Sequence, residues 1–503
     1  MSAWRLALLV AASLAVVPLS DAAVFAVTKT TDSADGQCDA DCSLREAILA
    51  ANQLQDTSNR IDLAPGTYRL SIPRDPERFG NGLGTGADGN LVVSRTLTIA
   101  GAGRDTTVID ARPAPEAASV DRVLAVAQSG HLTLGDVTIT GGRAGEFAQG
   151  GGIVVLGGTL AIHDCRVSGN VALGGGGGIA LGGASANPPA MATITRCEIA
   201  GNVAGSEALG AQGGGLLDIQ ATMTVVESTI RDNVALFSTG GGIMNIDNQS
   251  RPNPAAELTV ERSTIVGNLA GDPAGLSIFE GVGGGIYNAG GLLRLTNSTV
   301  TGNEAVASFA EGLGQIAGTG RGGGVAHALL AGDDASDGTF IVASTIAYNT
   351  APTGSQIYGE AQVNPAQLAN TLIAGGAGAS ANCASPSGQV GIASVGGGNL
   401  SDDASPCGLG LPGDQSGVGD PGLADALADN GGPTETIALL EGSPAIGAGY
   451  VPSCPQRDQR GYTRRSPCDV GAFETVPEPG AAAASLAAVG TLELLRRRAG
   501  RAG

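Results

Sequence analysis

Hydrophobic and polar residues alternate in short runs through the middle of the chain, and the runs recur at intervals of 31 to 46 residues. Alternation with a period of two is typical of a strand with one buried face. In each copy, two aliphatic positions are followed by a small residue and then by a third aliphatic position. The alternation shifts by one residue between the second aliphatic position and the small residue. The pattern predicts two short strands that meet at a corner, repeated in a stack.

Two further columns follow from aligning the copies. A Gly-Gly-Gly-aliphatic phrase precedes each copy, and an asparagine closes it. Stacked asparagines can bond along a repeat and cap turns, which is the structural interpretation, and a ligand-binding ladder is the alternative. The asparagines are Asn170, Asn202, Asn233, Asn268, Asn303 and Asn349. The expected corner residues are Asp164, Arg196, Glu227, Arg262, Asn297 and Ala343.

These columns predict an all-β fold, a single-stranded right-handed parallel β-helix. Each repeat would form one coil, stacked on the next at about 4.8 Å. Glycine accounts for 82 of 503 residues and aromatic residues for 3%, which disfavours helices and a large globular core. Ser43 and Glu46 form a capping box that predicts a short helix over the first coil. Residues 91–100 and 123–134 are expected to be strands of early coils, and a cap is expected at the C-terminal end.

The proposed register places Cys165 and Cys197 in the same column of adjacent coils, so it predicts a disulfide between them. It also places Arg166 opposite Glu198 on the outer surface. The pairing of the other six cysteines stays open, although they are close in sequence as Cys38 and Cys42, Cys383 and Cys407, and Cys454 and Cys468.

The net charge bears on the partners of the protein, and the first segment indicates that it is exported. The formal net charge of −20 disfavours nucleic acid as a partner. Residues 1–22 combine Arg5, an apolar stretch and small residues before a cleavage point, as a secretory signal does. Export through the Sec pathway would permit disulfides. The alternative, a membrane anchor, requires a longer apolar stretch.

Motifs at both ends resemble known families. Residues 42–48, Cys-Ser-Leu-Arg-Glu-Ala-Ile, resemble the CSLREA signature of bacterial exported repeat proteins. Residues 427–446, 458–461 and 468–474 resemble the choice-of-anchor Q domain, which implies a β-helix and a C-terminal surface anchor. Ile437 and Gly447 stand where that family would have His and Asp, which places a metal or polar role at these two positions in doubt.

The last segment resembles a PEP-CTERM sorting signal. It combines a Pro-Glu-Pro tripeptide, an apolar stretch and an arginine cluster: Pro477, Glu478, Pro479, Arg496, Arg497 and Arg498. The resemblance implies recognition by an exosortase-type sorting machinery and membrane contact through the tail; the alternative is a tail with a weak helix. The expected organisation is a signal peptide (1–22), a cap with first coils (23–125), the β-helix (126–380), an anchor-Q-like region (381–475) and a sorting segment (476–503).

Catalytic and metal sites were sought where acidic residues interrupt the repeat. Carbohydrate cleavage needs paired carboxylates, and the candidates are Asp218, Asp232 and Asp247. A loop with three more acidic residues is a candidate calcium site: Asp333, Asp334 and Asp337. Each has a simpler interpretation as a turn or solvated loop. No cofactor is predicted, and calcium is the candidate metal.

The favoured hypothesis is therefore an exported, surface-sorted, non-catalytic protein. It would present a repetitive face for adhesion or for association with matrix polysaccharide. The alternative hypothesis is an extracellular polysaccharide lyase or glycoside hydrolase acting through carboxylates on the solenoid surface. Convergence of Asp218, Asp232 and Asp247 in a groove would favour the enzyme, and a flat face would favour adhesion.

Overall fold

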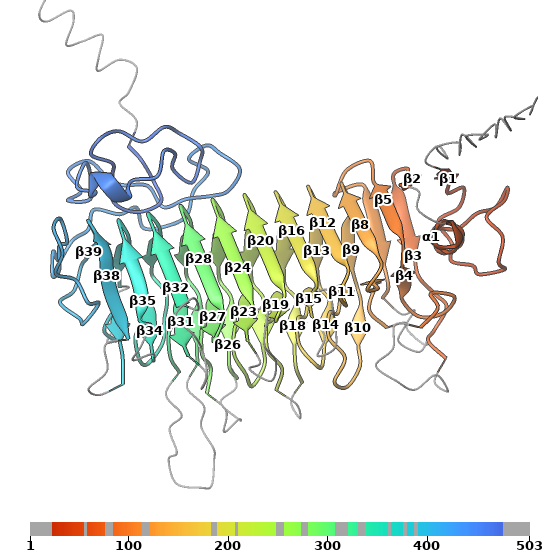
Figure 1. Cartoon of the computed structure of the whole chain (residues 1–503), viewed down its shortest axis with the longest axis horizontal. Helices are drawn as coiled ribbons and strands as arrows, with labels where there is room; N and C mark the ends of the chain where they lie inside the picture. Colours follow the sequence, from red (N-terminus) through yellow and green to blue (C-terminus); the bar gives the residue numbers. More distant parts are fainter. Residues whose placement is uncertain are drawn as a thin grey trace, which may run out of the picture.

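The chain winds into a long solenoid of stacked parallel strands (Figure 1). The computed structural model describes residues 23–54, 58–75, 84–112, 121–182, 189–206, 210–247, 256–272, 280–306, 320–329, 338–360, 364–375, 380–386 and 391–475. The predicted signal peptide (1–22) and sorting segment (476–503) lie outside these residues. The predicted parallel β-helix is confirmed by the strand order.

Four parallel sheets run along the solenoid. Sheet A consists of β1 (Val24–Ala26), β2 (Asn59–Asp62), β5 (Thr96–Ala100), β8 (His131–Gly135), β12 (Thr159–His163), β16 (Met191–Thr195), β20 (Thr222–Val226), β24 (Glu257–Glu261), β28 (Leu292–Thr296), β32 (Gly338–Val342), β35 (Ala366–Ala369) and β38 (Ile392–Gly397). Sheet B consists of β3 (Gly66–Arg69), β6 (Thr107–Asp110), β9 (Thr138–Thr140), β13 (Arg166–Ser168), β17 (Glu198–Ala200), β21 (Thr229–Arg231), β25 (Thr264–Val266), β29 (Thr299–Thr301), β33 (Thr345–Ala347), β36 (Leu372–Ala374) and β39 (Leu400–Ser401).

The other two sheets complete each turn of the solenoid. Sheet C consists of β4 (Leu91–Val93), β7 (Leu124–Val126), β11 (Ile153–Val155), β15 (Ile179–Leu181), β19 (Leu216–Ile219), β23 (Ile243–Ile246), β27 (Ile286–Ala289), β31 (Val325–Ala328), β34 (Ile357–Gly359) and β37 (Cys383–Ala384). Sheet D consists of β10 (Arg143–Ala144), β14 (Val171–Ala172), β18 (Val203–Ala204), β22 (Val234–Ala235), β26 (Leu269–Ala270) and β30 (Glu304–Ala305). A central coil passes through sheets A, B, D and C in that order.

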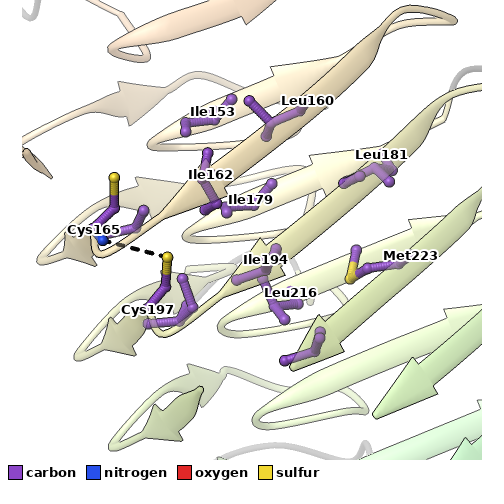
Figure 2. Packing of buried hydrophobic residues seen from close by; sticks show 14 of the residues in the cluster. Ile153, Leu160, Ile162, Cys165, Ile179, Leu181, Ile194, Cys197, Leu216 and Met223 are labelled. Carbon is purple, nitrogen blue, oxygen red and sulfur yellow. Dashed lines mark hydrogen bonds between the residues drawn. The ribbon is translucent and has the colours of Figure 1, made fainter. Parts of the chain in front are cut away.

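The core is a set of aliphatic columns inside the coils. Period-2 alternation turns Leu160 and Ile162 of β12 inward, where they meet their register partners of the next coil (Figure 2). Val167 of β13 pairs in the same way with Ile199 of β17. Because each inward residue stacks on an equivalent one, the buried cylinder needs no large aromatic side chains.

The predicted bend between sheets A and B is confirmed by the backbone. All six expected corner residues adopt a left-handed conformation, with φ between 46° and 54°. This conformation reverses the in–out alternation, so side chains on both sides of the corner point into the core. Asp232, which replaces a glycine of the repeat, also has a positive φ of 56°, and aspartate tolerates this region better than most residues.

The asparagine column forms a continuous hydrogen-bonded ladder inside the turn. The side-chain amide of each asparagine donates to Oδ1 of the next; for example, Asn233 Nδ2 lies 2.9 Å from Asn268 Oδ1, and the ladder ends on Gln356 Oε1 at 2.8 Å from Asn349 Nδ2. The backbone N–H of Asn233 also donates to Asn268 Oδ1, at 3.0 Å. All six side chains are buried, and the ladder satisfies the turn's polar groups.

The predicted disulfide between Cys165 and Cys197 is wrong: both cysteines are free and buried. The register is correct, but side chains in this column all point along the stack. Cys197 Sγ accepts from the backbone N–H of Cys165 at 3.4 Å (Figure 2), and Ser228 Oγ accepts from Cys197 N–H at 3.0 Å. The two sulfur atoms therefore lie one rung apart with the same orientation, rather than facing each other. The other six cysteines form disulfides within their sequence pairs.

Alkylation under non-reducing, denaturing conditions is expected to modify two cysteines, Cys165 and Cys197, and mass spectrometry of the peptides checks this. In the folded protein both thiols should resist alkylation, because they are buried. The Cys165→Ser variant should fold, because Ser228 and Ser263 occupy the same column. A peptide linking the two cysteines would contradict this account.

The predicted capping helix is α1 (Leu44–Gln53), and both hydrogen bonds of its capping box are formed. Leu44, Ala47 and Ile48 join the main hydrophobic cluster at the N-terminal end of the solenoid. Arg45 is also buried, and its guanidinium donates to Asp32 at 2.8 Å and to Gly86 O at 2.8 Å. The helix therefore covers the first coil as expected.

The C-terminal region, residues 402–475, folds back along the outer surface of sheet B (Figure 1). Its one short 3₁₀-helix is η1 (Val451–Ser453). Gln459 Nε2 donates to Thr264 Oγ1 at 2.9 Å, and Thr299 Oγ1 donates to Gln459 Oε1 at 2.6 Å. The C-terminal region thus covers the sheet B side of the coils that contain β25 and β29.

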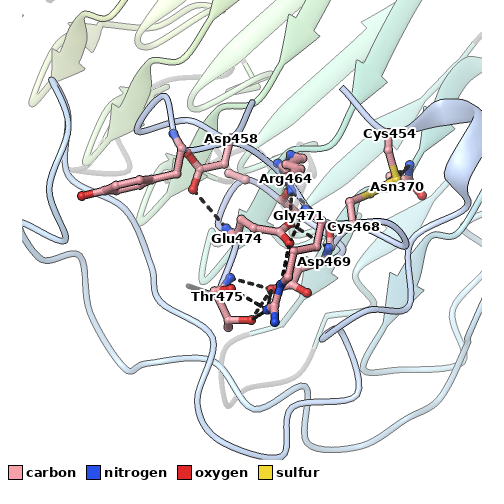
Figure 3. A network of polar contacts seen from close by, with 12 residues as sticks. Asn370, Cys454, Asp458, Arg464, Cys468, Asp469, Gly471, Glu474 and Thr475 are labelled. Carbon is pink, nitrogen blue, oxygen red and sulfur yellow. Dashed lines mark hydrogen bonds and ion pairs between the residues drawn. A yellow bond between two sulfur atoms is a disulfide. The ribbon is translucent and has the colours of Figure 1, made fainter. Parts of the chain in front are cut away.

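An apolar cluster and a buried polar network hold this region in place. Leu423, Ile437 and Val470 pack with Leu372 of β36, so the isoleucine at position 437 serves as a core residue. Arg464, which lies beside Gly471 and Glu474 in Figure 3, donates through Nη2 to Asn297 Oδ1 at 2.9 Å. Within the described residues, no helix is long and apolar enough to cross a bilayer.

Candidate functional site

The outer face of sheet A carries columns of side chains in register along the solenoid. It is the face toward the viewer in Figure 1; the C-terminal region lies along sheet B and reaches sheet A at β38, where Ser453 Oγ donates to Gly396 O. On the seven sheet A strands β5, β8, β12, β16, β20, β24 and β28, the outward side chains form three columns in unbroken register. Neighbouring rungs lie about 4.8 Å apart, so the seven strands span roughly 30 Å.

Threonine is the most frequent residue in these columns and fills most of the central one. Because the inward positions of the strands are aliphatic, period-2 alternation places the β-branched polar residues outside. The outward threonines on β5 through β28 are Thr96, Thr98, Thr133, Thr159, Thr193, Thr195, Thr222, Thr224, Thr259 and Thr296, and all are half-buried or exposed. They give a flat surface rich in hydroxyl groups.

Few charges interrupt the threonine face. The ionisable outward residues on these strands are His131, His163, Glu257, Glu261 and Arg294. His131 Nδ1 lies 2.7 Å from Thr159 Oγ1. The guanidinium of Arg294 lies 5.4 Å from the centroid of the Phe340 ring on β32, a cation–π geometry. The face is therefore close to neutral, although the chain carries a net charge of −20.

The uncovered part of sheet B has a different chemistry, because its charges are paired. Glu198 accepts from Arg166 at 2.6 Å, as the register predicts, and from Arg231 at 2.7 Å. Asp105 and Asp232 extend this ion-pair network at its two ends. Burial alone would raise the pKa of Glu198, but its hydrogen bonds with the two arginines lower it overall.

The corner residues also pair along the stack. Asp164 contacts Arg196 at 2.7 Å, and Glu227 contacts Arg262 at 3.0 Å. The hydrogen bond from Arg196 lowers the pKa of Asp164. Exposed pairs of this kind contribute about 0–1 kcal/mol each, so they help to align the coils more than they stabilise them.

The three candidate catalytic carboxylates do not converge. Asp218 of β19 points into the solenoid and is 0% exposed. Asp232 follows β21 on the outer surface, where it pairs with Arg231 at 2.7 Å. Asp247 follows β23 and accepts from Gln220 Nε2 at 3.0 Å. A glycosidase places two carboxyls on either side of one bond, which a carboxyl inside the core cannot do for a substrate outside.

The candidate calcium ligands Asp333, Asp334 and Asp337 lie outside the described residues, as do all six residues of the sorting motif. Among the residues that the structure describes, no three His, Cys, Asp or Glu side chains are grouped to hold a metal ion.

Sequence reasoning missed a polar column inside sheet C. It comprises Asp218, Asn245, Asn288 and His327, each 0% exposed and paired in register with the next. The signal was present, because each residue stands two positions after the aliphatic residue of a glycine phrase, and period 2 makes that position inward.

Comparison with known proteins agrees with this architecture. Residues 122–322 match the family described as "Right handed beta helix region". No curated protein matches the chain.

Several solved structures resemble the chain. Pectate lyase Pel9A is 15% identical, with a TM-score of 0.47 over 91% of this chain and 98% of that chain. A pectin methylesterase from carrot is 17% identical, with a TM-score of 0.31 over 63% and 86%. The catalytic domain of a GH87 α-1,3-glucanase in complex with nigerose is 13% identical, with a TM-score of 0.29 over 71% and 67%. The strand order and the family match over residues 122–322 show that the chain has a right-handed parallel β-helix fold.

Proposed function

We propose that this chain is an exported, surface-sorted, non-catalytic β-helix protein whose threonine face on sheet A binds extracellular polysaccharide. The observation that carries the proposal is the face itself: a regular sheet of seven strands whose central outward column is mostly threonine. Sugar hydroxyls can exchange hydrogen bonds with threonine, and the methyl groups pack against sugar rings. Repetition along the stack would let one long polymer make many weak contacts at once.

Charge and disulfides support the rest of the proposal. A net charge of −20 repels polyanions, so the favoured partner is a neutral polysaccharide. Three disulfides suit an oxidising compartment outside the cytoplasm. Sorting by an exosortase-type machinery and membrane contact through the tail are part of the same proposal and rest on the motifs at residues 477–479 and 496–498.

A screen of the purified protein against neutral and acidic polysaccharides, with and without calcium, tests the proposal. Thr224→Glu places a bulky charge at the centre of the threonine face, and we expect it to weaken binding at least about tenfold, or about 1.4 kcal/mol. Thr229→Glu makes the same change in the same coil but on sheet B, and should leave binding unchanged. Equal loss in both variants would place the binding surface elsewhere, and release of reducing or unsaturated ends would favour the lyase or hydrolase.

A further inference from the structure

The polar column inside sheet C ends on two oxygen atoms that have no donor. Asp218 Oδ1 accepts from the backbone N–H of Ala221 at 3.1 Å. Its other oxygen, Oδ2, and Oδ1 of Asn245 are both buried without a hydrogen-bond partner. The two residues are register partners on the adjacent strands β19 and β23. A carboxylate beside an amide oxygen would leave two buried acceptors unsatisfied, which is costly.

The hydrogen bonds below this pair fix the orientation of the Asn245 amide. Asn245 Nδ2 donates to Asn288 Oδ1 at 2.7 Å, so Nδ2 points down the column. Asn288 Nδ2 donates in turn to Thr339 Oγ1 at 2.9 Å and to Gly291 O at 2.7 Å. Flipping either amide would set donor against donor or acceptor against acceptor. Asn245 therefore presents its oxygen, and not its nitrogen, toward the coil of Asp218.

The far end of the column has the same polarity. His327 Nε2 lies 2.8 Å from the carbonyl oxygen of Asn364, which can only accept, so Nε2 carries the proton. His327 Nδ1 then accepts from the Thr339 hydroxyl at 3.1 Å. Burial lowers the pKa of His327, which keeps the ring neutral. From Asn245 to Asn364, each hydrogen bond along the column is therefore donated in the same direction. The missing donor is the one for Asn245 Oδ1 at the start of the column.

We infer that Asp218 is protonated in the folded protein and donates its O–H to Asn245 Oδ1. A neutral carboxylic acid supplies the missing donor and satisfies both oxygens. The proton makes the stability of the central coils depend on pH.

The surroundings of Asp218 favour the neutral form. Burial, with a smaller contribution from the negative charge of Glu257 on β24, raises the pKa of Asp218 from 3.8 to about 8. Its neighbours in the column on β15 and β23 are Leu181 and Asn245, which carry no charge, and His327 further along the column is neutral. The unfolded chain releases the proton near pH 4 and the folded chain near pH 8. Stability from this proton is therefore complete below about pH 4 and is lost as pH rises toward 8.

Asp218→Asn tests the inference, because an amide N–H replaces the acid O–H and does not titrate. Denaturant unfolding of the full chain is measured from pH 5 to pH 8. We expect the unfolding constant of the wild type to rise relative to that of the variant by about tenfold per pH unit. Asp247→Asn, which changes an aspartate outside the column, should follow the wild type. A wild-type to Asp218→Asn ratio that stays constant with pH would overturn the inference.

Infrared spectroscopy of the wild type tests the same proton without a substitution. At pH 6 we expect the carbonyl band of a protonated carboxylic acid, which shifts when aspartate carries a ¹³C carboxyl and is missing in Asp218→Asn. A band that persists in Asp218→Asn would assign the proton to another aspartate. Absence of the band in the wild type, or stabilisation by added sodium or calcium ions that Asp218→Asn abolishes, would show a cation between the two oxygens instead.

Discussion

Replacing Asn268 by alanine is expected to lower the free energy of unfolding by about 3–5 kcal/mol, because several buried polar groups lose their partners at once. Asn268 Oδ1 accepts both the backbone and the side-chain N–H of Asn233, and its Nδ2 donates to Asn303 Oδ1 and Ile230 O. Urea denaturation followed by circular dichroism measures the loss.

Asn430→Ala is the matched control for this prediction. Asn430 also donates its side-chain amide to two acceptors, both on Thr436, but it is only half-buried and lies outside the ladder. Its replacement should cost about 1 kcal/mol or less. If Asn268→Ala were as mild as this control, the ladder would be a by-product of stacking and not a source of stability.

Arg464→Ala is expected to cost about 3–5 kcal/mol and to release the C-terminal region from sheet B. The guanidinium is buried and joins Asn297 Oδ1 at 2.9 Å, Gly471 O at 2.7 Å and Glu474 Oε2 at 3.3 Å (Figure 3). Burial lowers the pKa of Arg464, and without its charge Glu474 is left buried with the half-exposed Arg465 as its remaining ion-pair partner. Hydrogen exchange in residues 420–475 reports the release.

Arg465→Ala separates the charge effect from the burial effect. Arg465 contacts the same Glu474 at 3.4 Å, but its side chain is 47% exposed. We expect a loss of about 0–1 kcal/mol and unchanged hydrogen exchange. Equal exchange in the two variants would mean that the apolar cluster around Leu423 and Val470 holds the region without help from Arg464.

Repetition is what made the fold predictable from sequence. A column read across several copies fixes register, so the corner at Asp164 and its equivalents, the asparagine ladder and the Arg166–Glu198 contact followed from alignment alone. The capping box at Ser43 was equally local, because its two hydrogen bonds join residues three positions apart.

Features that depend on side-chain direction or distant docking could not be predicted in this way. Register brought Cys165 and Cys197 to adjacent coils, but the shared orientation that keeps their sulfurs apart is a property of the backbone at the corner. Gln459 meets Thr264 across 195 residues of sequence, with no repeat to reveal the contact. Asp218 was expected on the solenoid surface as an acidic residue that interrupts the repeat; its spacing from Leu216 indicated an inward position, but its neighbours in the column were not predicted.

The most direct test of the central claim is to measure binding and turnover on one sample of the purified protein with a neutral polysaccharide. We expect saturable binding that Thr224→Glu weakens and Thr229→Glu does not, with no reducing or unsaturated ends released. Release of such ends by the wild type would contradict the central claim and would make the solenoid an enzyme whose catalytic carboxylates lie elsewhere than at Asp218, Asp232 and Asp247.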